Sequence, residues 1–248
     1  LGVFDYDGSS QINSNTFTTD AIFKSDIGVA TTSLSIDNYK DVAQASYKGN
    51  IILSSFDIGA LTKEPSLGEV SANVSIDGRG FTQKTVDTGL SGVISSFSFQ
   101  GYDYKNITLQ GALKDPVFNG DLSIDDPNVQ LDFKGLVDVS KSFNQFDFQA
   151  DVHFAELNKL QLVSRDSVSV FAGKVVVDMD GTTIDDIVGS FSFQQTFYQN
   201  QDDDFYFDDF KIASSFEDQK RIIDINSPDI CNGTISGNFL IKDISNLF

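Results

Sequence analysis

The stretch FNGDLSIDDPNVQLDFKG, residues 118–135, decides the fold class, because its large apolar side chains stand at every second position. Apolar residues alternate with polar ones before Asp126-Pro127, and Val129, Leu131 and Phe133 do so after it. A period of two places the apolar side chains on one face of a β-strand and the polar ones on the other. Proline is confined to loops and strand edges. The stretch therefore predicts two strands separated by a turn.

The same alternation recurs along the whole chain, whereas helical candidates are few. Dipeptides that tolerate positive φ separate many of the runs and are predicted to close antiparallel hairpins: Asp77-Gly78, Asn119-Gly120, Asp180-Gly181 and Asn232-Gly233. Only two segments, Phe56–Leu61 and Ala155–Leu162, could hold a turn or two of helix. No shift in composition marks a linker. The sequence predicts an all-β, antiparallel architecture.

The charge and composition exclude several classes of function. The 248 residues include 17 Lys and Arg against 36 Asp and Glu, so the formal net charge is -19. Nucleic-acid binding requires a basic surface, which this balance disfavours. Cys231 and His153 are the single cysteine and histidine, so zinc clusters and histidine-based triads have few residues to draw on. We expect no cofactor, no metal and no enzymatic activity.

An internal duplication organises the sequence. Four pairs of segments recur in the same order, about 94–103 residues apart. They are 56–61 with 154–160, 74–78 with 177–181, 96–100 with 190–194, and 126–135 with 227–237. The spacing predicts one continuous array with a partial unit at 1–48 and units at 49–148 and 149–248. In such arrays each unit contacts its neighbours.

One motif resembles a catalytic signature. The run 175–183, VVVDMDGTT, resembles the strand and D-x-D-G-T motif of haloacid-dehalogenase-type phosphotransferases, in which the first aspartate, here Asp178, would be the nucleophile. That chemistry requires a parallel sheet with crossover helices, and few residues follow Gly181. The duplicated segment 74–78 lacks the first aspartate. We therefore interpret the run as a junction between a strand and a turn.

Two acidic runs could suggest calcium. They are Asp5-Tyr6-Asp7-Gly8 and Asp202–Asp204, and neither is followed by the glutamate that completes a twelve-residue calcium loop. Solvated turns are the simpler interpretation.

A sheet with one apolar face must cover that face or use it. A sandwich or a closed barrel would bury the phenylalanines as core. An open, curved sheet would instead present them as a continuous apolar lining, which suits acyl chains. Alternation alone does not separate these possibilities, because each buries every second residue.

A family resemblance favours the open sheet. Residues 118–135, 137–140, 146–148 and 155–157 resemble the recurring pattern of the TamB and AsmA-like family of Bacteroidota-type bacteria, over about residues 50–245. The resemblance implies an elongated, taco-shaped β-groove of the bridge-like lipid transfer proteins. The implied groove lining is Ile51, Leu53, Val74, Ile76, Phe97, Phe99, Val129, Leu131, Phe133, Phe146, Phe148, Phe191, Phe193, Phe239 and Ile241.

The same resemblance implies a cellular role. An inner-membrane-anchored protein of this family would carry phospholipid through the periplasm of a Gram-negative bacterium toward the outer membrane. It would support outer-membrane assembly together with a TamA-like barrel partner. This chain would be an internal segment, with the anchor and the partner contact outside it. The alternative is a structural or adhesive β-repeat module of the cell envelope that transfers no lipid.

Overall fold

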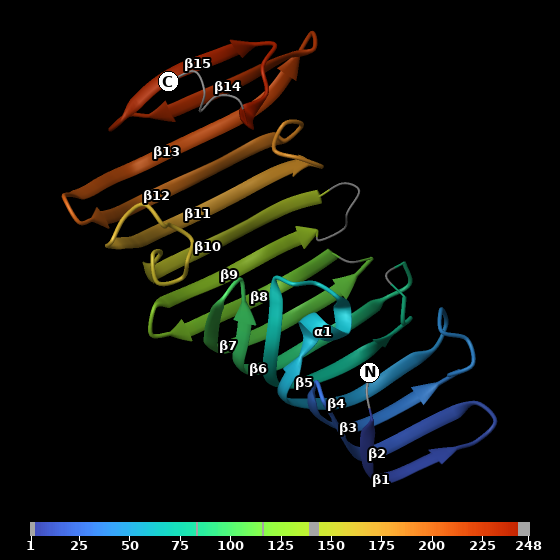
Figure 1. Ribbon diagram of the computed structural model, residues 1–248. Coiled ribbons are helices and arrows are strands. Elements are labelled where there is room, and N and C mark those ends of the chain that lie inside the picture. Colours follow the sequence, from blue (N-terminus) through green and yellow to red (C-terminus); the bar gives the residue numbers. More distant parts are fainter. Residues whose placement is uncertain (1–2, 83, 116, 139–143, 243–248) are drawn as a thin grey trace. The chain divides into compact units, whose positions relative to one another are not determined.

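The computed structural model describes residues 3–82, 84–115, 117–138 and 144–242. Their elements are fifteen strands and one short helix (Figure 1). In chain order these are β1 (Phe4–Ile12), β2 (Thr16–Ser25), β3 (Gly28–Asp37), β4 (Ser46–Asp57), α1 (Ile58–Thr62), β5 (Leu67–Arg79), β6 (Asp87–Phe99), β7 (Tyr102–Lys114), β8 (Val117–Asp126), β9 (Val129–Asp138), β10 (Asn144–Glu156), β11 (Ser169–Gly181), β12 (Val188–Asn200), β13 (Asp204–Glu217), β14 (Lys220–Ser227) and β15 (Cys231–Gly237).

The strands form one sheet in the order of the chain, β1 to β15, and the sheet is not closed. The strand pairs with a described register are antiparallel. This confirms the predicted all-β, open antiparallel fold. The chain divides into two compact units, one holding β1–β8 with α1 and the other holding β9–β15, with the boundary between Pro127 and Asn128. Each unit is described by itself below.

The duplication is visible in the strand bounds as a repeat of six strands. β2 and β8 begin at Thr16 and Val117, 101 residues apart, and β3 and β9 begin at Gly28 and Val129, also 101 apart. β6 and β12 begin at Asp87 and Val188, again 101 apart. A repeat of about 100 residues is therefore present, as the sequence predicts.

One of the four matched segments is misaligned with this repeat. Residues 96–100 lie at the end of β6, whereas residues 190–194 lie near the start of β12. Their identical letters reflect the common alternation of Ser and Phe. The match between Asp126-Pro127 and Ser227-Pro228 agrees with the repeat, because these residues end β8 and β14.

Three of the four predicted hairpin turns are wrong. Asp77-Gly78, Asn119-Gly120 and Asn232-Gly233 lie inside β5, β8 and β15, while Asp180-Gly181 ends β11. In β8, Gly120 lies directly opposite Gly111 of β7, and a Cβ at Gly120 would stand 2.5 Å from the Cα of Gly111. A close approach of two backbones, and not a turn, accounts for this glycine.

The two helical candidates have different outcomes. The segment 56–61 overlaps α1, whose N-cap Asp57 accepts a hydrogen bond from the backbone N–H of Ala60 at 2.8 Å. Residues 157–161 form turns in the β10–β11 connection. Val139 and Ser140, which belong to the segment 137–140 of the family resemblance, lie outside the described residues.

The side chains of the first unit separate into an apolar and a polar face. Directly opposed residues of neighbouring strands point to the same side of a sheet. One row of the apolar face runs Thr32, Ile51, Val74, Gly92, Leu109 and Leu122 across β3–β8. A row of the polar face runs Asp20, Ser33, Asn50, Ser75, Ser91 and Gln110 across β2–β7.

No second layer covers the apolar face within the described part of the chain. Apart from α1 beside β5, the elements in extensive contact are strands paired within the sheet. The accessible surface is 14817 Å², about a third more than the roughly 11,000 Å² expected for a compact protein of 27.1 kDa. The excess follows from a sheet whose two faces both meet solvent.

We predict that Gly49 is required for the pairing of β3 and β4. Its φ is +155°, and a Cβ there would stand 2.0 Å from the carbonyl oxygen of Ser33. Gly49→Ala should therefore lower the free energy of unfolding by about 2–3 kcal/mol, since the conformation is strained and the backbone must move. Gly233→Ala is the control, because a Cβ there meets nothing within 4 Å. Urea unfolding of both variants measures the difference, and equal losses would contradict the prediction.

Candidate functional site

The predicted lining residues of the first unit share one face. Ile51 lies opposite Val74, and Ile76 lies opposite Leu90. Leu53 lies opposite Ala72, and Phe97 opposite Val70. The rings of Phe97 and Phe99 stack with centroids 6.0 Å apart. The six predicted residues Ile51, Leu53, Val74, Ile76, Phe97 and Phe99 are all half-buried, which is the exposure of side chains that pack sideways without a covering layer.

The second unit has an apolar face of the same kind. One row runs Phe133, Ala150, Val175, Phe193 and Phe210 across β9–β13. The next row runs Gly135, Phe148, Val177, Phe191 and Ile212. The predicted residues Val129, Leu131, Phe133, Phe146, Phe148, Phe191 and Phe193 all lie on this face.

The last two predicted lining residues depart from the pattern. Phe239 and Ile241 follow the end of β15 at Gly237, so they are not on a strand and do not extend the rows of the face. Phe239 instead lines a separate hollow beside Arg221. The alternation of residues 239–241 is too short to separate a strand from an irregular segment.

Sequence reasoning missed three members of an aromatic cluster on the apolar face of the second unit. The cluster consists of Phe171, Phe191, Phe193, Phe207 and Phe210. The ring of Phe193 is at its centre, with centroids 5.8 Å from Phe171, 5.4 Å from Phe191 and 6.4 Å from Phe210. Irregular pairing at Val152/Ala155 and at Ala172/Lys174 interrupts the alternation that would have identified Phe171.

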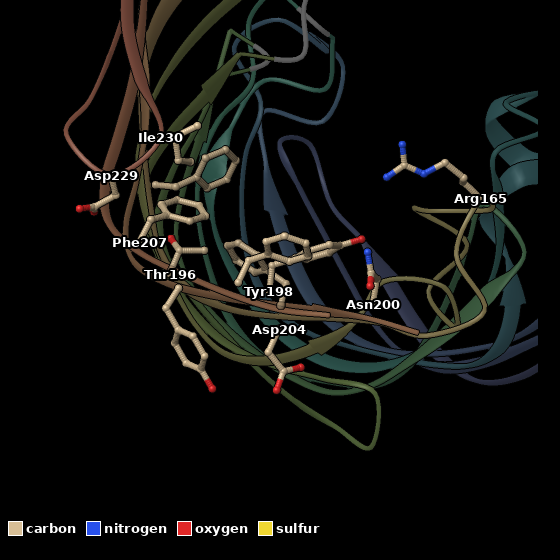
Figure 2. A pocket seen from close by; sticks show the side chains of 12 residues that line it. Arg165, Thr196, Tyr198, Asn200, Asp204, Phe207, Asp229 and Ile230 are labelled. Atoms are coloured by element: carbon tan, nitrogen blue, oxygen red, sulfur yellow. The ribbon is translucent and has the colours of Figure 1, made fainter. Parts of the chain in front are cut away.

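A hollow of about 700 Å³ opens over this cluster. In Figure 2 the side chains of Tyr198 and Phe207 line the hollow, and that of Asp204 points away from it. Arg165, from the β10–β11 connection, stands across the hollow from them. The hollow therefore has an aromatic floor and a charged group at its rim.

A hydrogen-bonded group fixes that rim. Tyr198 donates its hydroxyl proton to Asp166 Oδ2 at 2.8 Å, and the buried Ser169 Oγ lies 3.1 Å from the same hydroxyl. This bond from Tyr198, with the Arg165 guanidinium beside the carboxylate, holds the pKa of Asp166 below its usual value.

The lowered pKa of Asp166 gives a pH-dependent prediction. A carboxyl whose pKa is lower in the folded state stabilises the fold above its unfolded pKa of about 3.9, and that stabilisation is lost as the pH falls through the folded value. Tyr198→Phe removes the largest cause. We expect the wild type to unfold at a higher temperature than Tyr198→Phe at pH 7, and the difference to shrink below about pH 4. A pH-independent difference would contradict this. Tyr206→Phe, 73% exposed, is the control.

The residues that resemble a catalytic signature lie at a strand end. β11 ends at Gly181, and the backbone N–H groups of Thr182 and Thr183 donate to Asp186 Oδ1 at 2.9 and 2.6 Å. Asp178 is exposed and lies opposite Ser190 and Asp147, on the face away from Val177. This is the strand-to-turn junction that the duplication predicts.

Of the two acidic runs, Asp202–Asp204 leads from the β12–β13 turn into β13, which begins at Asp204. The interpretation of Asp5-Tyr6-Asp7-Gly8 as a turn is wrong, because these residues lie within β1. Asn200 Oδ1 accepts hydrogen bonds from the backbone N–H groups of Asp202 and Asp203 at 2.9 and 2.8 Å. Within the described ranges there is no group of three or more His, Cys, Asp or Glu side chains placed to hold a metal ion. The described helix is also too short to span a membrane.

Comparisons with known proteins leave the site to be interpreted on its own geometry. No protein-family model, no curated protein and no solved structure matches this chain.

Proposed function

We propose that this chain is a segment of a periplasmic, bridge-like lipid transport protein that carries phospholipid between inner and outer membranes. The apolar face would hold the acyl chains. The observation that supports this most is the rows of apolar, mostly half-buried residues on a face that, among the described residues of each unit, no second layer covers. Burial of apolar surface contributes roughly 25 cal/mol per Å², so a lipid chain on this face would be favoured over water.

The distribution of polar groups supports the same proposal. Acyl chains need continuous apolar surface and few hydrogen bonds, and the rows of the face supply aliphatic, aromatic and glycine positions. The opposite face carries Ser, Asn, Asp and Gln and would keep the sheet in solution. Transport would be passive, with tails sliding along the face and headgroups at its edge. No covalent step is proposed, and a TamA-like barrel would be contacted through other regions of the protein.

The test is the lipid content of the purified chain. The chain is expressed with periplasmic targeting in a Gram-negative host, purified without detergent and examined by native mass spectrometry and lipid extraction. We expect phospholipid to co-purify in at least equimolar amount. A folded, monodisperse chain without bound lipid would contradict the proposal and favour a structural or adhesive β-repeat module.

A further inference from the structure

A buried cation interrupts the apolar face of the second unit. Arg221 lies opposite Phe216 in the β13–β14 hairpin, on the same face as Ile223 and Ile225. It is 1% exposed. In the β1–β2 and β7–β8 hairpins, the pairs with the same spacing across the turn are Ile12 with Phe17 and Leu113 with Phe118. Counted from the turn, the β13–β14 hairpin thus places a guanidinium where these two hairpins place a phenylalanine.

The guanidinium is held in place but is not neutralised. Its Nη1 donates to the carbonyl oxygen of Ile187 at 3.1 Å and to Ser214 Oγ at 2.6 Å, and its Nη2 donates to the carbonyl oxygen of Asp185. The ring of Phe216 lies 4.4 Å from its central carbon. Among the described residues Arg221 has no carboxylate partner. A buried charge without a counter-ion is costly.

Two N–H donors of Arg221 have no partner among the described residues. Arginine has five N–H groups, of which three are used here. Nε has no partner, and Nη2 retains one hydrogen. The Nε and Nη2 side of a guanidinium is the edge that a carboxylate or phosphate contacts with two parallel hydrogen bonds.

A hollow of about 470 Å³ adjoins this group. Its walls include Arg221 and Lys220 together with Phe216, Phe239 and Leu240. Phe216 and Leu240 are 47% and 43% exposed, so apolar surface stands open beside the cation. Two carboxylates, Asp185 and Asp218, also line the hollow. Asp185 is engaged by Lys242 Nζ at 3.2 Å, and Asp218 lies on the exposed hairpin turn.

We infer that this hollow is an anion site for an amphiphile: Arg221 binds a phosphate or carboxylate, and Phe216, Phe239 and Leu240 contact the chain attached to it. The inference that the hollow binds an anion depends on Arg221 alone and not on the proposed function. The apolar half rests on the proposed function, in which such a ligand is a lipid with its headgroup at the edge of the face.

The test compares matched ligands on the full chain. Octyl phosphate and octyl glucoside, each below its critical micelle concentration, share a chain and differ in the anion, and inorganic phosphate supplies the anion without the chain. Binding is measured by calorimetry, and thermal unfolding is measured in phosphate and in chloride at equal ionic strength. We expect octyl phosphate to bind at least ~10-fold more tightly than either octyl glucoside or inorganic phosphate, and phosphate to raise the unfolding temperature above that in chloride.

Variants locate the site. Arg221→Gln should weaken octyl phosphate at least ~10-fold, to the affinity of octyl glucoside. Lys211→Gln is the control: it removes the same charge from an exposed position opposite Ser192 and should change nothing. If Arg221→Gln does not fold, the wild-type comparisons decide the question.

Each outcome has a defined meaning. Equal affinities of the wild type for octyl phosphate and octyl glucoside, with no effect of phosphate on unfolding, would overturn the site. Equal affinities for octyl phosphate and inorganic phosphate, both lost in Arg221→Gln, would support a free-phosphate site and overturn its amphiphile half. Retained phosphate binding in a chain that carries no lipid would contradict the proposed function and leave the anion site intact.

Discussion

Phe193→Asp is expected to abolish lipid transfer between vesicles while leaving the sheet folded. Phe193 lies at the centre of the aromatic cluster and contacts the rings of Phe171, Phe191 and Phe210. A carboxylate there replaces apolar contact with a charge that must stay hydrated. Loss of contact with only two methylene groups of an acyl chain, at about 0.8 kcal/mol each, lowers the affinity of the face for lipid about tenfold. The charge of the aspartate lowers this affinity further.

Tyr206→Asp is the matched control for this prediction. Tyr206 lies on the neighbouring strand and is 73% exposed, and its ring packs at a tilt against that of Phe197 on the opposite face, with centroids 4.9 Å apart. It should transfer lipid at the wild-type rate. Circular dichroism confirms folding of both variants. Wild-type transfer by a folded Phe193→Asp chain would contradict the proposed role of the face. Phe99→Asp makes the same test in the first unit.

Asp126→Ala is expected to cause the largest loss of stability among single polar substitutions in the first unit. Asp126 ends β8 and is 1% exposed. It accepts hydrogen bonds from the Tyr102 hydroxyl at 2.5 Å and from the backbone N–H of Lys105 at 3.0 Å. Removing the carboxylate leaves both donors without this acceptor, at a cost of about 2–4 kcal/mol in the free energy of unfolding.

The repeat strengthens the prediction for Asp126. The corresponding residue 101 positions later, Ser227, is fully buried and donates to the carbonyl oxygen of Asp209 at 2.7 Å. Both residues therefore tie the end of an even-numbered strand to the strand before it: Asp126 to the start of β7, and Ser227 to the middle of β13. Urea unfolding followed by hydrogen exchange in β7 and β8 measures the loss, with exposed Asp7→Ala as control. A loss no larger than that of the control would show that Asp126 is not a structural acceptor.

The sequence predicted the faces better than it predicted the strand ends. Alternation has the same period as the strand, so Ile51, Val74 and Phe193 could be placed on the apolar side without knowing any pairing. Every register shift of one residue would invert such a face, and the predicted lining residues within strands keep to one side in each unit. The repeat of about 100 residues was predictable for a different reason, namely that similar segments recur in the same order.

The features that the sequence predicted wrongly or missed are those that depend on the neighbouring strand. Gly78 and Gly120 resemble turn residues by letter, but they are interior positions where the neighbouring backbone comes close. The aromatic cluster needed the irregular pairing beside Phe171 to be known. From the sequence alone, Arg221 would be predicted to be an exposed cation. Only its burial opposite Phe216 in the structure distinguishes it from the exposed Lys and Arg residues.

Site-specific photocrosslinking tests the central claim most directly. A benzophenone amino acid is placed in β6 at Leu90 or Ile94, on the apolar face, and at Ser91 or Val93, on the polar face. The chain is expressed with periplasmic targeting in a Gram-negative host, irradiated in living cells and analysed for attached phospholipid. The proposed function predicts crosslinks to lipid at Leu90 and Ile94 and none at Ser91 and Val93. Equal crosslinking at both pairs, or none at either, would contradict it.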